Sequence, residues 1–261
     1  MSTATAAAPV NAKELESKVQ AMYRDVAEHP EGKYHFEMGR TLAERLGYPP
    51  ADLDRIPAQA IESFAGVGHY FHLASIRAGE TVVDLGSGSG MDSFLAALKV
   101  EPQGKVIGVD MTDAQRLKAQ RLRDGGGFGN VSFLKGYIDS VPLPDQSADV
   151  VISNGVFNLA PDKAAVFAEV ARLLKPGGRL AIADIVTDQQ LPESISCNTT
   201  LWAACIGGAA QRDDYRGMIE AAGLKVDTVE DNDAYRFISD SALGATRKYG
   251  VKSVSIRAVR P

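Results

Sequence analysis

The feature of this sequence that most constrains its fold is a glycine-rich turn at residues 84–90, which reads Asp-Leu-Gly-Ser-Gly-Ser-Gly. The turn directly follows the apolar run 81–85 and precedes a helix-like stretch at 92–98. Glycines let a backbone turn sharply and let a ligand approach without a Cβ in the way. The first amides of the following helix have no partners within that helix. A strand, a glycine turn and a helix in this order predict a site for a nucleoside-containing ligand.

The acids on either side of this turn indicate which nucleoside ligand binds. Asp110 ends a second apolar run about 20 residues after Gly90, where a carboxylate can accept hydrogen bonds from a ribose diol. The glycines follow the spacing Gly-x-Gly-x-Gly, whereas a pyrophosphate is held by Gly-x-Gly-x-x-Gly. Asp84 at the start of the turn would repel a pyrophosphate and suit a cation. We therefore expect S-adenosylmethionine as the cofactor, with a nicotinamide-dependent oxidoreductase as the competing interpretation.

Apolar strand patterns and helical patterns alternate through the middle of the chain. The expected strands are 81–85, 106–110, 131–134, 148–153 and 179–183, and the expected helices are 92–98, 114–123 and 163–174. Near-continuously apolar strands alternating with helices predict a parallel sheet covered on both faces. Right-handed crossovers make that sheet doubly wound and Rossmann-like. The alternating stretch 253–259 is expected to close the sheet as an antiparallel strand, after a helix at 213–222 and a strand at 225–229.

The N-terminal region has a different pattern. Helices are expected at 12–28, 36–46 and 57–76, the last containing the Gly66-Val67-Gly68 step, which is either a hinge or a simple turn. The expected domains are an N-terminal helical cap over residues 1–78 and an α/β core over residues 79–261. Insertions at about 187–212 and 233–248 are expected over the carboxyl ends of the strands.

Composition excludes several classes of protein. The 261 residues carry a net charge of −5, so a basic surface for nucleic acid is not expected. No apolar run approaches the roughly 18 residues that span a bilayer, and no export signal is expected from the small and polar first residues. The chain has 2 cysteines, Cys197 and Cys205, so no disulfide framework is expected. We expect a cytoplasmic protein with a small-molecule substrate, no membrane partner, and a possible homodimer through an apolar cap surface.

Residues 80–184 resemble the class I S-adenosylmethionine-dependent methyltransferases. The resemblance is carried by the glycine turn, by Gly108-Val109-Asp110 and by the Lys175-Pro176-Gly177-Gly178 turn. It implies methyl transfer from the cofactor to an acceptor. It also implies a set of cofactor-binding residues, namely Asp84, Gly86, Ser87, Gly88, Gly90, Asp110, Met111, Ile138, Asp139 and Asn154.

A narrower resemblance, over roughly residues 80–225, is to the arsenite methyltransferases. Its most distinctive segment, 201–209, reads Leu-Trp-Ala-Ala-Cys-Ile-Gly-Gly-Ala. The resemblance implies an arsenic site made of cysteine thiolates. This chain has Ser93 and Gly155 at two of the family's cysteine positions and no cysteine before residue 197, so only Cys205 matches. We therefore expect a small organic or thiol acceptor. Arsenite methylation and a non-catalytic S-adenosylmethionine-binding protein are the alternatives.

Three residues are candidates for the catalytic step. A sulfonium already carries a good leaving group, so the enzyme mainly places the acceptor in line within a dry pocket. A general base is needed only for an alcohol, a phenol or an acidic carbon. The candidates are His35, His69 and Cys205; His69 lies three residues before His72 and would share a helical face with it. Two histidines do not make a metal site, and none is expected. Asp184 is expected at the mouth of the cleft.

Overall fold

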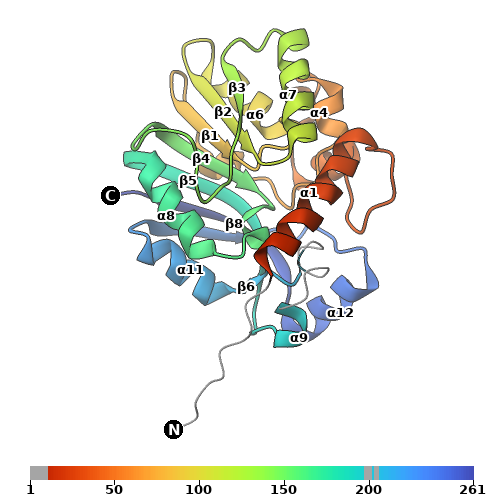
Figure 1. The fold of residues 1–261 in the computed structure, drawn as a ribbon. Helices are drawn as coiled ribbons and strands as arrows, with labels where there is room; N and C mark the ends of the chain where they lie inside the picture. The colour runs from red at the N-terminus through yellow and green to blue at the C-terminus, as the bar shows by residue number, and fades with distance from the viewer. Residues whose placement is uncertain (1–10, 197–201, 203–205) are drawn as a thin grey trace.

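The computed structural model of the chain describes residues 11–196, 202 and 206–261, which surround a central eight-stranded sheet (Figure 1). The strand order is β3-β2-β1-β4-β5-β8-β7, with the short β6 paired to β5. The strands are β1 (Thr81–Leu85), β2 (Lys105–Asp110), β3 (Val131–Lys135), β4 (Ala148–Asn154), β5 (Leu174–Thr187), β6 (Ala210–Gln211), β7 (Lys225–Asp231) and β8 (Lys252–Val259). Strands β1 to β5 are parallel, and β8 is antiparallel to both β5 and β7. The predicted doubly wound sheet with an antiparallel last strand is confirmed.

Two apolar clusters, one on each face of the sheet, hold the core together. Neighbouring residues of β1 alternate between them: Val82 packs in one cluster and Val83 in the other, and both are fully buried. The helices α6 (Met91–Val100) and α7 (Asp113–Gly126) pack on one face, and α8 (Lys163–Leu173) and α11 (Arg212–Ala221) cover the other. Because β1 lies between β2 and β4, the crossovers diverge there and open a crevice at the carboxyl ends of these strands.

The N-terminal region is helical, but one of its predicted helices is wrong. The observed helices are α1 (Ala12–Glu28), α2 (Gly39–Leu46), α3 (Pro50–Leu53), α4 (Ala58–Glu62) and α5 (Phe71–Ala74). The helix α1 has the predicted bounds. The helix predicted over 57–76 is instead the two short helices α4 and α5, separated by an irregular segment, because residues 66–68 pack closely against the core instead of continuing a helix.

The segment Gly66-Val67-Gly68 is held by hydrogen bonds and by tight contacts. The amide of Val67 donates to Asn154 Oδ1 at 2.7 Å, and Asn154 Nδ2 donates to the Gly68 carbonyl at 3.0 Å. A Cβ on Gly66 would lie 2.6 Å from Asn154 Nδ2, and one on Gly68 would lie 2.2 Å from the side chain of Asn232. These glycines therefore permit close packing, and the segment is a fixed turn.

The two expected insertions contain short elements of their own. The helix α9 (Glu193–Ser196) and β6 lie in the first, and α12 (Asp240–Tyr249) lies largely in the second. Both cysteines fall outside the described residues. Within the described part of the chain, no helix combines the length and apolarity that a membrane span requires. The boundary between a cap and a core at residues 78 and 79 remains a prediction.

Candidate functional site

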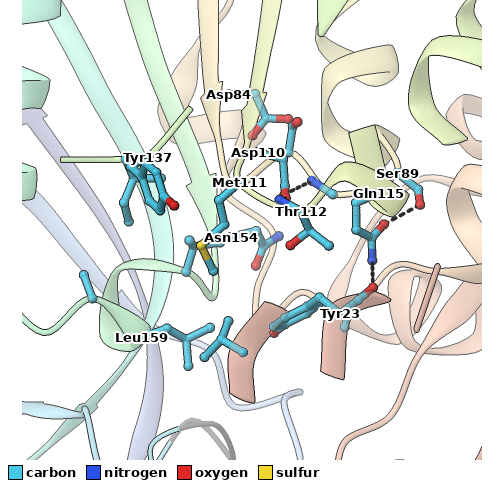
Figure 2. Close-up of a pocket in the computed structure, with 18 of the residues that line it drawn as sticks. Tyr23, Asp84, Ser89, Asp110, Met111, Thr112, Gln115, Tyr137, Asn154 and Leu159 are labelled. Carbon is cyan, nitrogen blue, oxygen red and sulfur yellow. Dashed lines mark hydrogen bonds between the residues drawn. The ribbon is translucent and has the colours of Figure 1, made fainter. Parts of the chain in front are cut away.

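A cavity of about 310 Å³ lies at the carboxyl ends of β1, β2 and β4, a size typical of small-molecule sites (Figure 2). We call its two sides the sheet wall and the cap wall. The sheet wall consists of Asp84, Gly86, Ser87, Gly88, Ser89, Met91, Asp92, Asp110, Met111, Thr112, Gln115, Gly136, Tyr137, Ile138, Asp139, Asn154, Val156, Leu159, Ala160 and Pro161. The cap wall consists of Ala12, Leu15, Glu16, Val19, Tyr23, Ala60, Ser63, Phe64, Ala65 and Gly66. Nine of the ten predicted cofactor residues line this cavity, and Gly90 does not.

The glycine turn takes a backbone shape that only glycine adopts easily. Gly86 has a φ of +74° and Gly90 a φ of +95°, both in the left-handed region. A Cβ on Gly86 would lie 2.5 Å from a methyl of Val156, and one on Gly90 would lie 2.7 Å from the ring of Phe133. Gly86 thus lets the turn approach the loop after β4, and Gly90 lets α6 pack against β3. The role of Gly90 is therefore in shaping the turn.

Asp110 stands at the end of β2 with its carboxylate held by two backbone amides. Oδ2 accepts from Gly88 at 2.9 Å, and Oδ1 accepts from Thr112 at 2.7 Å (Figure 2). Burial raises the pKa of Asp110, and the two amide hydrogen bonds oppose that rise. The Thr112 side chain also bonds to the carboxylate, and the lone-pair capacity that remains is available to a ligand. The side chain is thus fixed in position as a double acceptor at the edge of the cavity.

Two further carboxyl groups, of Asp84 and Asp92, are buried at the cavity. Asp84 accepts a hydrogen bond from Ser93 Oγ at 2.6 Å, and Asp92 Oδ2 accepts one from Tyr70 at 2.7 Å. Burial, followed by repulsion from Asp92, raises the pKa of Asp84 to about 8. Burial also raises the pKa of Asp92. Sequence reasoning missed Asp92, although an acid in the first turn of the helix after the glycine turn was a usable signal.

The charges around the cavity have one sign. The carboxyl groups that line it are those of Glu16, Asp84, Asp92, Asp110 and Asp139. Among the described residues lining it, none is a lysine, arginine or histidine. Such a cavity would repel a pyrophosphate and attract a ligand with positive charge. The residues present therefore fit S-adenosylmethionine, which has an ammonium, a sulfonium and a ribose but no phosphate.

The histidines predicted as bases lie away from the cavity. His69 packs its ring against Tyr48, with centroids 4.6 Å apart, and burial lowers its pKa to about 4. His72 is exposed and places Nε2 2.8 Å from a carboxylate oxygen of Glu230. His69 is not in a helix, because α5 begins only at residue 71, but its ring still stacks on that of His72 with centroids 5.8 Å apart. The ring of His35 packs on its neighbour Phe36. None of these histidines is among the residues that line the cavity, although His69 contacts Tyr48, which is bonded to Asn154.

Asp184 and Cys205 complete the predicted set. Asp184 Oδ2 accepts from the Asn158 amide at 2.9 Å and from the Tyr215 hydroxyl at 2.7 Å. Burial raises the pKa of Asp184 to about 6. Asp184 does not line the cavity; it fixes the loop after β4 instead. Cys205 lies outside the described residues. In the described ranges, no three His, Cys, Asp or Glu side chains are grouped as a metal site.

A line of hydrogen bonds, which sequence reasoning also missed, joins the glycine turn to α1. Ser89 Oγ donates to Gln115 Oε1 at 2.5 Å, and Gln115 Nε2 donates to the Tyr23 carbonyl at 2.8 Å (Figure 2). Farther along α1, the Tyr137 hydroxyl donates to Glu16 at 2.7 Å. These contacts hold α1 over the cavity as part of the cap wall.

Comparison with known proteins agrees with this site. A family described as "Methyltransferase domain" matches residues 76–223. An arsenite methyltransferase of Halobacterium salinarum is 40% identical over 222 residues, which are 84% of this chain and 56% of that protein. The crystal structure of an arsenic(III) S-adenosylmethionine methyltransferase from Chlamydomonas reinhardtii is 33% identical, with a TM-score of 0.68, over 81% of this chain and 72% of that one. The chain belongs to the S-adenosylmethionine-dependent methyltransferases.

The predicted family, its fold and its cofactor are thereby confirmed, as is the narrower similarity to arsenite methyltransferases. This methyltransferase spans about half the length of the first curated relatives it matches, 56% in Halobacterium salinarum and 49% in Aquipseudomonas alcaligenes. A geranyl diphosphate methyltransferase in complex with GPP and sinefungin shares the fold over 95% of this chain, with a TM-score of 0.67 at 18% identity. The likeness in fold therefore extends well beyond the matched domain.

Proposed function

We propose that this methyltransferase transfers a methyl group from S-adenosylmethionine to a small organic acceptor bound between the sheet wall and the cap wall. The observation that carries the proposal is the cavity itself. It combines a glycine turn, a fixed double acceptor at Asp110, and carboxyl groups without a cation among the described lining residues. A nucleoside with a positive charge at its far end matches all three features.

Each part of the sheet wall has a separate task in this proposal. Asp110 binds the ribose diol, and Ile138 with Asp139 faces the adenine. Asp84 faces the cationic end, and Asn154 holds the Gly66–Gly68 turn beside it. The cofactor supplies an electrophilic methyl group on a sulfonium. The protein's residues bind and orient the two reactants and exclude water, which is the main requirement of such a transfer.

The cap wall indicates the nature of the acceptor. It is mostly apolar, with Leu15, Val19 and Phe64 buried there. Among the described residues that line the cavity, none is a histidine or a cysteine. An acceptor that is already nucleophilic, such as a thiol, a free amine or a stabilised carbanion, needs no neighbouring base. We therefore favour an acceptor of that kind with an apolar body.

Arsenite methylation is the second candidate, because the curated relative from Halobacterium salinarum is an arsenite methyltransferase. Two details weigh against it. Gly155 occupies one of the family's cysteine positions. A Cβ there would lie 3.1 Å from a methyl of Val67, so a thiol at this position would adjoin an apolar side chain. Ser93, at another of these positions, is fully buried and donates to Asp84. The candidate therefore depends on Cys205, with Cys197 as the remaining thiol.

The first experiment is calorimetric titration with S-adenosylmethionine and S-adenosylhomocysteine, with NAD as the control ligand. We expect micromolar binding of the first two and none of NAD. In Asp110→Ala, two hydrogen bonds to the ribose are lost, which weakens binding by about 100-fold. The matched control is Asp113→Ala, an exposed acid that pairs with Lys135 on the outside of the same region. Tight NAD binding, or equal loss in both variants, would overturn the cofactor assignment.

The second experiment identifies the acceptor and tests the non-catalytic alternative. Release of S-adenosylhomocysteine is measured with thiols, amines, acidic-carbon compounds and arsenite in parallel. Turnover on an organic nucleophile supports the proposal. Turnover on arsenite alone, lost in Cys205→Ser, supports the second candidate. Binding without turnover on any acceptor supports a non-catalytic binding protein.

We also propose a cytoplasmic location and no nucleic-acid partner, on the basis of the net charge of −5 and the 2 cysteines. A homodimer through the helical N-terminal region is the proposed assembly. Cell fractionation tests the location, and size-exclusion chromatography with light scattering tests the assembly. A monomer at micromolar concentration would overturn the dimer.

A further inference from the structure

Asp92 has one carboxylate oxygen that nothing in the described structure satisfies. Oδ2 accepts hydrogen bonds from Tyr70 at 2.7 Å and from Asn154 Nδ2 at 3.1 Å. Oδ1 is buried and receives no hydrogen bond from any described group, although Asp92 borders the cavity and is only 6% exposed. An unsatisfied buried carboxylate oxygen is costly. Either a proton or a cationic ligand would remove that cost.

Asp84 lies close enough to Asp92 for the two carboxyl groups to repel each other. That repulsion is the second largest cause, after burial, of the raised pKa of Asp84, about 8. Asp110, on β2, adds a smaller repulsion of the same sign. The neutral hydroxyl of Ser93 is the only described group that donates to the Asp84 side chain.

No described cation balances this pair from the surrounding elements. Around Asp92 the N-terminal region contributes the hydroxyls of Tyr48 and Tyr70, whose own pKa values are raised by burial. The strand β4 contributes the neutral amide of Asn154. Two more acids, Glu16 of the cap wall and Asp139 of the sheet wall, also line the cavity. The charge that balances two ionised carboxylates must therefore come from outside the described residues.

We propose, on the basis of the proposed function above, that Asp84 and Asp92 share one proton in the ligand-free enzyme and release it when the sulfonium-bearing cofactor binds. With one proton, the pair has a single negative charge, which matches the ammonium present in both the cofactor and its product. The additional positive charge on sulfur stabilises ionisation of the second carboxyl group. The pair thus selects the cationic cofactor over the product, whose sulfur is neutral.

The proposal gives the pair a role in turnover as well as in binding. After methyl transfer the sulfur is a neutral thioether, and the two carboxylates again repel each other in a region of low dielectric. One carboxylate takes up a proton from solvent, and the product is then held by one ionic contact fewer. Asp84 and Asp92 are therefore specificity-determining residues that favour exchange of product for fresh cofactor.

Titration calorimetry in phosphate and in Tris buffer measures the proton release directly. At pH 6.5 we expect S-adenosylmethionine to release about one proton more than S-adenosylhomocysteine, because a group with a pKa near 8 is almost fully protonated there. Between pH 6 and pH 7 the affinity for the cofactor rises about tenfold, and the affinity for the product changes by less than about twofold. Equal proton release by the two ligands would overturn the proposal and leave the proposed function intact. Failure of both to bind would overturn both.

Variants locate the proton. In Asp84→Asn the extra proton release on cofactor binding disappears. The affinity for the cofactor no longer depends on pH, and the enzyme no longer prefers the cofactor to the product. In Asp92→Asn the affinity for the cofactor at pH 8 falls at least tenfold more than the affinity for the product. Asp113→Asn, which removes an exposed acid from the start of α7, leaves the release unchanged. Proton release that persists in Asp84→Asn would assign it to another group and overturn the proposal.

Discussion

The two walls of the cavity are built by different means. On the sheet wall, polar side chains stand at strand ends and are fixed by backbone partners, as Asp110 is by the amides of Gly88 and Thr112. On the cap wall, apolar side chains such as Leu15 and Val19 come from one helix, which is tied to the sheet wall through Gln115 and Tyr137. Changing a residue of the sheet wall disturbs hydrogen bonds to the core, whereas changing one of the cap wall mostly alters the surface offered to a ligand.

This difference separates two kinds of recognition. A fixed polar wall suits a ligand that never changes, the cofactor, because its geometry is set by the strands. An apolar wall on a helix tied by a few contacts can vary without loss of the fold. We therefore expect the sheet wall to set cofactor affinity and the cap wall to set acceptor choice. The following predictions test that division.

The largest effect is expected for Gly86→Ala on the sheet wall. The new Cβ would meet Val156 at 2.5 Å in a backbone conformation with a φ of +74°. We expect the free energy of unfolding to fall by about 2–4 kcal/mol and cofactor binding to be lost. Gly125→Ala in α7 is the control, since its Cβ meets nothing within 4 Å and helix propensity favours alanine by up to about 1 kcal/mol. Urea denaturation measures the free energy of unfolding of the two variants, and calorimetry measures their cofactor binding. Normal cofactor binding by Gly86→Ala would show that the sheet wall does not set cofactor affinity.

The next effect concerns the pH dependence of stability. The pKa of Asp84 is about 8 in the folded protein, above that of an unfolded aspartate, so the folded state holds a proton that the unfolded state loses. The stabilisation that this proton gives the folded state is fully present below about pH 4 and is lost as the pH rises through 8. From pH 6 to pH 8 the free energy of unfolding of the ligand-free protein should fall by about 2 kcal/mol. Denaturant unfolding of the wild type and Asp84→Asn measures it, and we expect a much flatter profile in the variant. Identical slopes would contradict the prediction.

A smaller effect is expected where the two walls are joined. Gln115→Ala removes the acceptor of Ser89 Oγ and the donor to the Tyr23 carbonyl. We expect the free energy of unfolding to fall by about 1–3 kcal/mol and amide hydrogen exchange in α1 to become faster. Gln120→Ala is the control, because its amide bonds to Phe133 on β3 and not to α1. Equal exchange in α1 in both variants would show that Gln115 does not hold the cap wall in place.

The smallest effect is expected for Tyr137→Phe, which removes the exposed hydrogen bond to Glu16. Solvent competes for this contact, so we expect a change of about 0.5 kcal/mol or less in unfolding free energy. The dissociation rate of the cofactor should rise by about twofold, measured by stopped-flow fluorescence. A tenfold rise would mean that this contact, and not the sheet wall, limits cofactor release.

The parallel strands were predictable because each is an apolar run bounded by turns, and β8 because polar and apolar residues alternate in its sequence. The alternation does not extend to burial, since β8 lies between β5 and β7 and its serines are buried as well. Asp84, the turn glycines and Asp110 followed from the same pattern, since the ends of parallel strands meet at one edge, whereas Ile138, Asp139 and Asn154 were implied by the resemblance to the methyltransferases. The irregular residues 63–70 were not predictable from periodicity. Gly66 and Gly68 are fixed by Asn154 and Asn232, which lie far away in the sequence. Helical spacing therefore wrongly placed His69 in a helix, although its ring does stack on that of His72.

Asp92 and Gln115 were missed for a related reason. Asp92 looks like an ordinary acid at the start of a helix, and its importance depends on Tyr70 and on Asp84, which only the fold brings near it. Gln115 looks like a surface residue of α7, but α1 covers it. Helical periodicity gives the faces of a helix but not the element that packs on each, so the cap wall could not be derived from the sequence.

The clamp on the Gly66–Gly68 turn has a consequence for how the chain acquires its shape during synthesis. Ser253, on β8, donates a hydrogen bond to the carbonyl of Val67 at 2.7 Å, and Asn232 packs against Gly68. Residues 63–70 leave the ribosome long before β8 does. Until β8 has paired with β5 and β7, this turn lacks part of its support, and Asn154 lacks a fully anchored partner. A nascent chain stalled before residue 252 should therefore not retain the cofactor, although the strands carrying the glycine turn and Asp110 have already been made.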